Sequence, residues 1–278
     1  MKTMKSSSQL WIHALIILYL LFLIFPLVWV FASSLKSTQE LYSGLPTLLP
    51  QQITFDHYRS VINGQQIFRS MWNSLIVGVV STLLVVSIAV PSAYAMVRYK
   101  SPVNTLILGW ILLSQIFPVI LVMIPLYVLL RYAGLTDSLN GLTLIYIVWS
   151  LPFVLWMMHG YVKSIPLELE EAAVMDGASR SQVIMKVLFP LLLPAIGASA
   201  LFAFISAWNE FFFALVLMKS PALATLQVEL ARYTGMEGQS RTGPLAAASV
   251  IATIPSMLVF IMMRKWFTTG LVSGALKG

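Results

Sequence analysis

The chain has 278 residues, of which 59% are hydrophobic and only 10% are charged. Soluble domains average about 25% charged residues, so this composition excludes an ordinary soluble protein and indicates one that is solvated by lipid. The net charge of +7 does not indicate a nucleic-acid partner, because the 17 Lys and Arg residues are scattered between apolar segments and form no basic face.

The first predicted element is a transmembrane helix over 12–31. It follows Lys2 and Lys5, as the apolar part of a signal peptide would. A run of about 20 apolar residues fits a spanning helix better than a signal sequence, and no A-x-A cleavage site follows it. We therefore expect this segment to be retained.

The segment after the first span carries a stripe of apolar residues at helical spacing. Its members are Tyr58, Val61, Ile62, Ile67, Phe68, Met71 and Trp72. Because Trp is typical of the membrane interface, the stripe predicts a helix lying on the membrane surface. A helix packed on the transmembrane bundle fits the pattern equally well.

Five further apolar stretches, uncharged apart from Glu210, are long enough to cross a bilayer, whose core of about 30 Å needs roughly 20 helical residues. The six predicted spans are 12–31, 74–96, 105–130, 142–162, 191–218 and 245–263. The predicted fold is therefore an all-α membrane protein with six transmembrane helices in a single domain over 1–278.

An even number of spans puts both termini on the same side of the membrane. Cytoplasmic termini place ten of the 17 Lys and Arg residues inside and seven outside, which is a weak positive-inside bias. Two cationic pairs that flank spans, Arg98 with Lys100 and Arg264 with Lys265, favour the same orientation. The connection 163–190 is then cytoplasmic and the connection 219–243 is external.

The connection 163–190 carries the signals of a helix, a sharp turn and a second helix. Pro166 suits a first helical turn, an acidic cluster over 168–171 complements a helix N-terminus, and Gly177 suits a C-terminal stop. The stretch 179–182 matches a capping box, so a second helix is expected there. This second helix presents one apolar face, made of Val183, Ile184, Val187 and Leu188.

Small side chains in this connection permit close approach of another surface. Ala172 and Ala173 have little bulk, and the acidic cluster beside Arg180 offers charge-assisted contacts. The pattern fits a docking element for another protein. From these residues alone, a solvated hairpin between two spans is the simpler interpretation.

The spacing of this segment resembles the EAA loop of ATP-binding-cassette importer permeases. That loop has E-A-A, three residues, G, nine residues and I-x-L-P, and here Glu171-Ala172-Ala173 is followed at the same spacings by Gly177 and Val187-Leu188-Phe189-Pro190. Val and Phe replace the family's Ile and Leu, and both stay apolar. The resemblance implies a cytoplasmic coupling loop that sits in a cleft of an ATPase subunit and transmits its closure. The implied contact residues are Glu171, Ala172, Ala173, Asp176, Gly177 and Arg180.

The resemblance extends from the first span to the last residue and is strongest to permeases of maltose-type carbohydrate importers. Trp208-Asn209-Glu210 and the tail 270–278 look like that subgroup. The implied partners are a second homologous permease, an ATPase dimer, an extracytoplasmic sugar-binding protein and a carbohydrate. The implied location is a bacterial or archaeal cytoplasmic (inner) membrane.

Two terminal features acquire expected roles by the same resemblance. The cytoplasmic tail 264–278 is expected to insert between the ATPase subunits, with Gly274 and Lys277 as contacts, although a frayed terminus is the alternative. The external loop 219–243 resembles one that reaches into the binding protein's sugar cleft, and a plain connector is its alternative.

No catalytic machinery is recognisable in the sequence. There is no G-x-x-x-x-G-K-[ST] phosphate loop, so ATP and Mg are expected in partner subunits and this chain is expected to be neither an enzyme nor a cofactor carrier. The three histidines lie on different segments, and the absence of cysteine excludes thiolate metal sites. We expect no metal site.

Polar residues inside the predicted spans mark candidate positions of the substrate pathway. An ionisable group in lipid is costly, so Glu210 is expected to face the bundle interior, water or a hydrogen-bond partner. Sugars are recognised by aromatic faces together with amides and carboxylates. The candidates are Trp208, Asn209, Glu210, Phe212, Asn73 and Gln115. A purely structural role for Glu210, as an anchor between helices, is the alternative.

Two other functions stay open at this point. An ion-coupled secondary transporter could use Glu210 to bind a proton. An intramembrane enzyme is a different class, but no nucleophile, metal site or paired carboxylates support it. The sequence does not identify the carbohydrate or the permease that holds the main substrate site.

Overall fold

The computed structural model describes residues 6–44, 47–64, 66–99, 101–235 and 241–275, with side chains over 11–264 of that part. Helices and connecting turns make up this described part, and it contains no strand. Five helices in it are long and apolar enough to cross a membrane, or up to six if one bent pair forms a single span. The predicted all-α membrane fold is confirmed.

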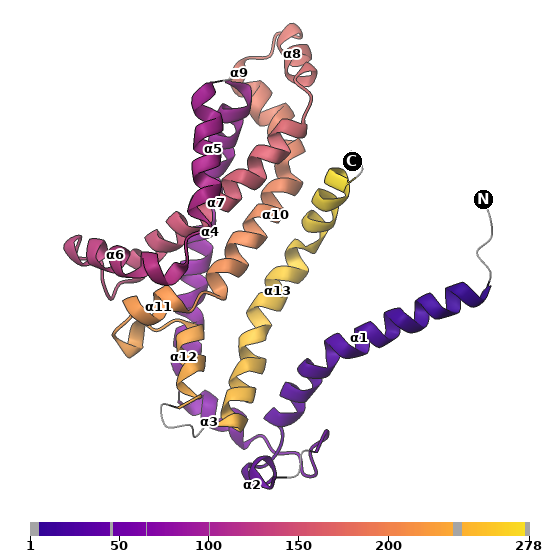
Figure 1. Ribbon diagram of the computed structural model, residues 1–278, viewed down its shortest axis with the longest axis vertical. Helices are drawn as coiled ribbons and strands as arrows, with labels where there is room; N and C mark the ends of the chain where they lie inside the picture. The colour runs from indigo at the N-terminus through magenta and orange to yellow at the C-terminus, as the bar shows by residue number, and fades with distance from the viewer. Residues whose placement is uncertain (1–5, 45–46, 65, 100, 236–240, 276–278) are drawn as a thin grey trace. The chain divides into compact units, whose positions relative to one another are not determined.

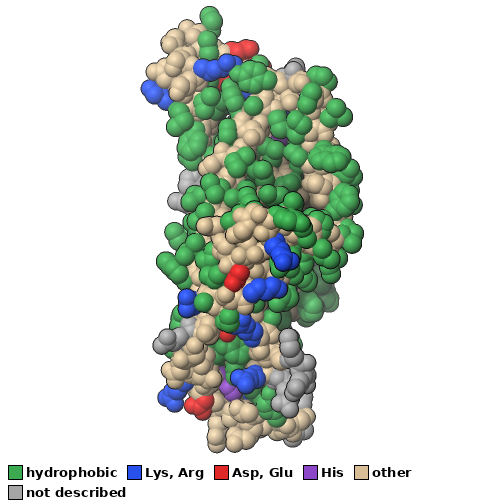
Figure 2. All heavy atoms as spheres, turned by 90° about the vertical axis from the view of Figure 1, so that its left-hand side faces the viewer, with side chains coloured by type: hydrophobic (Ala, Val, Ile, Leu, Met, Phe, Trp, Pro, Cys, Tyr) green, Lys and Arg blue, Asp and Glu red, His purple; other side chains and the backbone are tan. Residues whose placement is uncertain are grey.

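The contacts divide the chain into two compact units, and each is described by itself. The first contains residues 1–68 and 229–254, and the second contains 69–228 and 255–278. Many hydrophobic side chains lie at the surface in Figure 2, which suits a protein that faces lipid.

The first unit contains α1 (Ser6–Ser34), α2 (Thr38–Tyr42), α3 (Asp56–Asn63) and the start of α13 (Thr242–Ala275). The hydroxyls of Ser34 and Tyr58 lie 2.7 Å apart and join the end of α1 to α3. The Lys36 ammonium is buried, donates to the carbonyl of Thr47 and lies 4.9 Å from the ring centroid of Trp29.

The apolar stripe over 58–72 does not form one surface helix. Helix α3 ends at Asn63, and the residues from Ile67 to Trp72 form the first turns of α4 (Gln66–Arg98). Val61 is only 2% exposed. The alternative of a helix packed on protein therefore describes α3 better than a helix lying on the membrane.

The second unit is built around α4, α7 (Leu139–Ser164) and α10 (Phe189–Trp208). Residues from these three helices share a buried cluster that includes Ala89, Ala93, Met158, Leu192 and Ala195. Small residues at such contacts let helix backbones approach closely, which favours association in lipid. A second buried cluster joins residues of α11 (Phe212–Leu217) to Val77 of α4, Tyr146 of α7 and Ala207 of α10.

The third predicted span is broken. In its place lie α5 (Pro102–Ser114) and α6 (Val119–Tyr132), which are bent by 103° at the segment between them (Figure 1). Pro118 explains the break, because it has no N–H to donate and restricts the residue before it. A hydropathy profile does not show the break between α5 and α6, because both helices are apolar.

The fifth predicted span, 191–218, is displaced along the sequence. A continuous helical segment runs from Arg180 to Trp208 through α9 (Arg180–Gln182), a π-helical turn η1 (Val183–Leu188) and α10. It ends before Met218, and α11 follows after a short break. Helix α13 also continues past Met263, the predicted end of the sixth span, to Ala275.

Asp137 joins the turn after α6 to the segment after α11. Its carboxylate accepts hydrogen bonds from the N–H groups of Lys219 and Ser220, at 2.8 and 2.9 Å, and from the Ser220 hydroxyl at 2.5 Å. The Ser220 hydroxyl, followed by these N–H groups, holds the pKa of the Asp137 carboxyl below its usual range. The segment continues into η2 (Pro221–Leu223) and α12 (Leu226–Arg232).

Candidate functional site

The candidate site is the connection 163–190, which lies beyond the ends of α7 and α10 and carries α8 (Glu168–Met175) (Figure 1). Helix α8 ends in a Schellman motif: the N–H of Ala178 donates to the carbonyl of Ala173, and that of Gly177 donates to Val174. Gly177 has a φ of +82°, which glycine adopts without a Cβ penalty.

A capping box starts the next helix, as the sequence predicts. The Ser179 hydroxyl accepts from the N–H of Gln182, and the Gln182 side chain accepts from the N–H of Ser179 at 2.8 Å. On the apolar face of this helix, Val183 and Leu188 are buried. Two capping motifs, one before and one after Ala178, therefore fix the turn between the helices.

The six implied contact residues lie on α8, on the turn after it and at the start of α9. Glu171, Ala172, Asp176, Gly177 and Arg180 are exposed, and Ala173 is half-buried. Of these residues, Arg180 lies over the Tyr99 ring, with its guanidinium carbon 5.3 Å from the ring centroid. The six residues form a surface with small side chains at its centre and charges around it, which suits contact with another protein.

Exposed apolar residues enlarge this surface beyond the sequence prediction. Val174 is 57% exposed and Met175 is 87% exposed, both on the last turn of α8. Large exposed apolar side chains in a part of the chain that is otherwise acidic indicate a contact surface. Their position in the sequence, between the Ala pair and Gly177, is the signal that could have identified them.

The structure places Glu210 in the break between α10 and α11, where it caps α11. Its carboxylate accepts from the N–H groups of Phe213 and Ala214 at 2.8 and 3.1 Å, and from the Tyr146 hydroxyl at 2.8 Å. The hydrogen-bond partner expected for this residue is therefore present. These contacts favour the structural alternative, in which Glu210 joins α7 to α11.

The neighbours of Glu210 differ in their environments. Trp208 is 3% exposed, and its ring stacks on that of Phe204 with centroids 5.7 Å apart. Asn209 and Phe212 are exposed. Asn209 and Phe212 are therefore the members of this group whose side chains are exposed. A pathway role for the whole group stays a prediction.

Asn73 is an anchor for the segment after α11. It is buried, and its amide donates to the carbonyls of Ala222 and Ala224, both at 3.0 Å. One residue later, the Ser74 hydroxyl accepts from the N–H of Leu226 at 2.8 Å. Both donor hydrogens of the Asn73 amide are used, which gives this residue a structural role alongside the predicted one.

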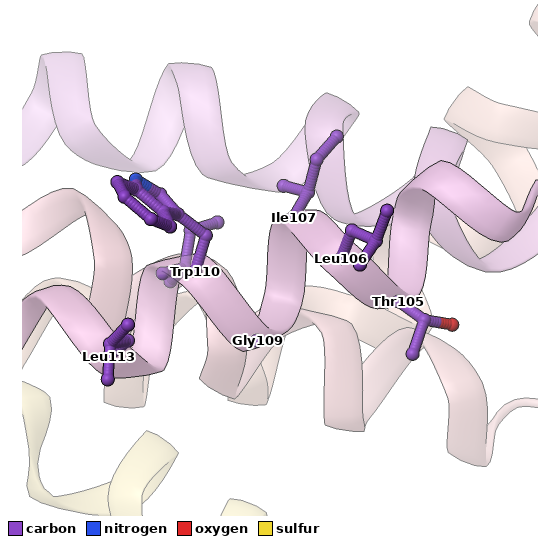
Figure 3. A pocket seen from close by; sticks show the side chains of 7 residues that line it. Thr105, Leu106, Ile107, Gly109, Trp110 and Leu113 are labelled. Carbon is purple, nitrogen blue, oxygen red and sulfur yellow. The ribbon is translucent and has the colours of Figure 1, made fainter.

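Gln115 lies apart from these residues, at the C-terminal cap of α5, where its side chain is exposed. An apolar hollow of about 520 Å³ runs along α5 itself and is lined by Thr105, Leu106, Ile107, Gly109, Trp110, Ile111 and Leu113 (Figure 3). Because a single helix lines it and Leu106 and Trp110 are more than 70% exposed, this hollow is an open apolar helix face and not an enclosed binding cavity.

The two residues of the tail prediction are only partly covered by the structure. Gly274 lies in the last turn of α13, and Lys277 lies outside the described residues. Within the part of the chain that has described side chains, no three His, Asp or Glu residues are grouped so that they could hold a metal ion.

Comparisons with known proteins identify the family of the chain. Residues 86–273 match the family described as "Binding-protein-dependent transport system inner membrane component". This range contains both the loop 163–190 and the break at Glu210.

Two relatives align over most of their length. The trehalose transport system permease protein SugB of Mycobacterium tuberculosis is 36% identical over 254 residues, which cover 91% of this chain and 92% of that protein. The trehalose/maltose transport system permease protein MalG of Thermococcus litoralis is 33% identical over 264 residues, which cover 94% of each.

A solved structure has the same fold. One chain of a bacterial ABC transporter involved in the import of the acidic polysaccharide alginate superposes with a TM-score of 0.79 at 28% identity. The superposition covers 96% of this chain and 100% of that one.

Proposed function

The chain belongs to the family of binding-protein-dependent transport system inner membrane components, and we propose that it is one permease of an ATP-driven carbohydrate importer. In this proposal it forms half of an alternating-access pathway with a second, homologous permease. An ATPase dimer binds ATP and Mg and drives the movement, and an extracytoplasmic binding protein delivers the sugar. The family is one of transporter permeases and not of enzymes, and it does not favour the ion-coupled alternative.

The observation that carries the proposal is the exposed loop with the EAA spacing. A Schellman motif and a capping box give it a defined shape, and Ala172 presents a small side chain at its surface. A preformed surface binds a partner without the cost of ordering a flexible segment. These features support docking of the loop on an ATPase subunit through Glu171, Ala172, Ala173, Asp176, Gly177 and Arg180.

The cargo is proposed at the level of carbohydrates. SugB and MalG are named as trehalose and trehalose/maltose permeases, and the similar solved structure imports alginate. Cytoplasmic termini, a single domain over 1–278, the tail 264–278 as an ATPase contact and the loop 219–243 as a binding-protein contact belong to the same proposal. The substrate-pathway candidates stay part of it as well.

The proposal is tested with the complete importer in lipid vesicles. We expect uptake of radiolabelled trehalose or maltose only when both permeases, the ATPase, the binding protein and ATP are present, and no uptake by this chain alone. Uptake by the lone chain that follows a proton gradient without ATP would overturn it. A ligand screen on the cognate binding protein identifies which sugar is carried.

Gly177→Ala is expected to weaken ATPase docking without unfolding the chain. No atom lies within 4 Å of the added Cβ, so the effect comes from φ alone. A left-handed conformation costs a non-glycine residue about 1–2 kcal/mol, which corresponds to about five- to thirtyfold in affinity when the loop must hold its docking shape. The measurement is ATPase binding to the purified permease pair.

Gly160→Ala is the matched control, because Gly160 also has no atom within 4 Å of an added Cβ but lies inside α7. Alanine is the better helix former, so this change should leave ATPase affinity unaltered. Equal affinities of the Gly177→Ala variant and the unchanged protein would show that the turn's conformation does not matter for docking.

A further inference from the structure

A buried ion pair fastens α8 to the end of α4. Nε of Arg98 donates to Oε1 of Glu170 at 2.5 Å, and the two side chains are only 12% and 10% exposed. The Tyr94 hydroxyl donates to the other carboxylate oxygen of Glu170 at 3.0 Å. Tyr94 and Arg98 lie four residues apart on α4 and so share a face of this helix.

Arg98 also reaches the end of α7. Its Nη2 donates to the carbonyl of Ile165, the C-terminal cap residue of α7, at 3.0 Å. The planar guanidinium presents several N–H donors in a fixed geometry, which lets one side chain hold a carboxylate and a carbonyl together. Arg98 therefore holds α4, α7 and α8 at one point.

The link between α8 and α4 runs through these side chains. Helix α8 packs directly on η1, which continues into α10. On the side of α4, a cavity of about 570 Å³ borders the ion pair, and both Arg98 and Glu170 line it. A displacement of α8 thus reaches α10 through packing and the chain itself, and it reaches α4 through the contacts of Glu170 with Arg98 and Tyr94. Arg180 of α9 lies over the ring of Tyr99, directly after α4, and is a second contact between the loop and this end.

A contribution to folding stability does not by itself explain why Arg98 and Glu170 form a buried ion pair here. Two charges lose their hydration when they are buried, and a buried ion pair is often no more stabilising than an apolar pair of the same size. In α4, Pro91 has no backbone N–H. One helical hydrogen bond is therefore missing about one turn before Tyr94. The helical ladder of α4 is thus incomplete next to the turn that carries Tyr94 and Arg98.

We propose that Arg98 is a positioning residue whose contacts with Glu170 and Ile165 transmit the displacement of α8 to the end of α4. This inference rests on the proposed function, because it requires that an ATPase moves α8. Arg98, Tyr94 and Glu170 lie outside the EAA pattern. Their role is to connect the proposed docking surface to a spanning helix through side chains.

The test compares transport with ATP hydrolysis in the reconstituted importer. The double variant R98A/E170A removes both charges, so it leaves no unpaired charge buried and should fold. We expect the variant to bind the ATPase and hydrolyse ATP at rates near those of the unchanged protein. Trehalose uptake per ATP should fall by about three- to thirtyfold, the range expected for residues on a coupling network. The charge reversal R98E/E170R should recover part of the loss.

The double variant D56A/R59A is the matched control. It removes an ion pair of 3.4 Å that is exposed on α3, and uptake per ATP should stay unchanged. Equal uptake per ATP in R98A/E170A and the unchanged protein would overturn the inference. Loss of ATPase binding in R98A/E170A would also overturn it, because the pair would then only maintain the docking surface. Failure of the unchanged importer to link ATP to uptake would instead overturn the proposed function.

Discussion

Replacing Ala172 with tryptophan is expected to abolish ATP-driven uptake while leaving the permease folded. Ala172 is exposed on α8, so the larger side chain meets no atom of this chain's core. In the proposed docked state, the same side chain occupies the space of the ATPase surface. Residues at the centre of an interface contribute about 2 kcal/mol or more, so the affinity should fall by about thirtyfold or more.

Three measurements check this prediction together: copurification of the ATPase, trehalose uptake in vesicles and thermal unfolding of the purified chain. Ser60→Trp is the control, because Ser60 is an exposed helical residue of α3, far from α8 in the sequence. The control should keep uptake and ATPase binding. If Ala172→Trp retained both at the level of the control, α8 would not be the docking element.

Glu210→Ala is expected to destabilise the protein strongly, because three buried donors lose their acceptor. Tyr146 is 3% exposed, Phe213 is 1% exposed and Ala214 is fully buried, so water does not replace the carboxylate at these groups. A buried unsatisfied group costs about 1–3 kcal/mol, and the loss should therefore reach several kcal/mol. Thermal unfolding of the purified chain should show a clear decrease in the unfolding temperature.

Tyr146→Phe separates the structural role of Glu210 from a role in sugar contact. This change removes one donor to Glu210 and leaves the carboxylate on the N-terminus of α11, so it should cost about 1 kcal/mol. A structural role predicts that uptake falls only as far as stability falls in both variants. Normal thermal stability of Glu210→Ala together with lost uptake would assign Glu210 to the pathway instead.

Local signals made the loop predictable. Gly177 stops α8, and Ser179 with Gln182 starts the next helix, because each motif needs only residues that are close in the sequence. Most spans could likewise be predicted from the length of their apolar runs. A helix in lipid needs an uninterrupted run of apolar side chains, whatever helices pack beside it.

The breaks within apolar segments do not follow from hydropathy. Pro118 separates α5 from α6, and the capped break at Glu210 separates α10 from α11, yet both predicted spans read as continuous by hydropathy. Hydropathy measures which side chains tolerate lipid, and it carries no information about the direction of the helix axis. A bend of 103° is set by backbone restrictions at a few residues and by the packing around them.

The sequence by itself determined that this chain is an all-α membrane protein, which family it belongs to and where the loop with the EAA spacing lies, because apolar length and short motifs act over neighbouring residues. Only the tertiary structure decided which polar groups meet. Arg98 and Glu170 are 72 residues apart, and Asn73 contacts a carbonyl 151 residues away. Such pairs form where helix packing brings buried charges and amides together, and each buried polar group must find its partner there.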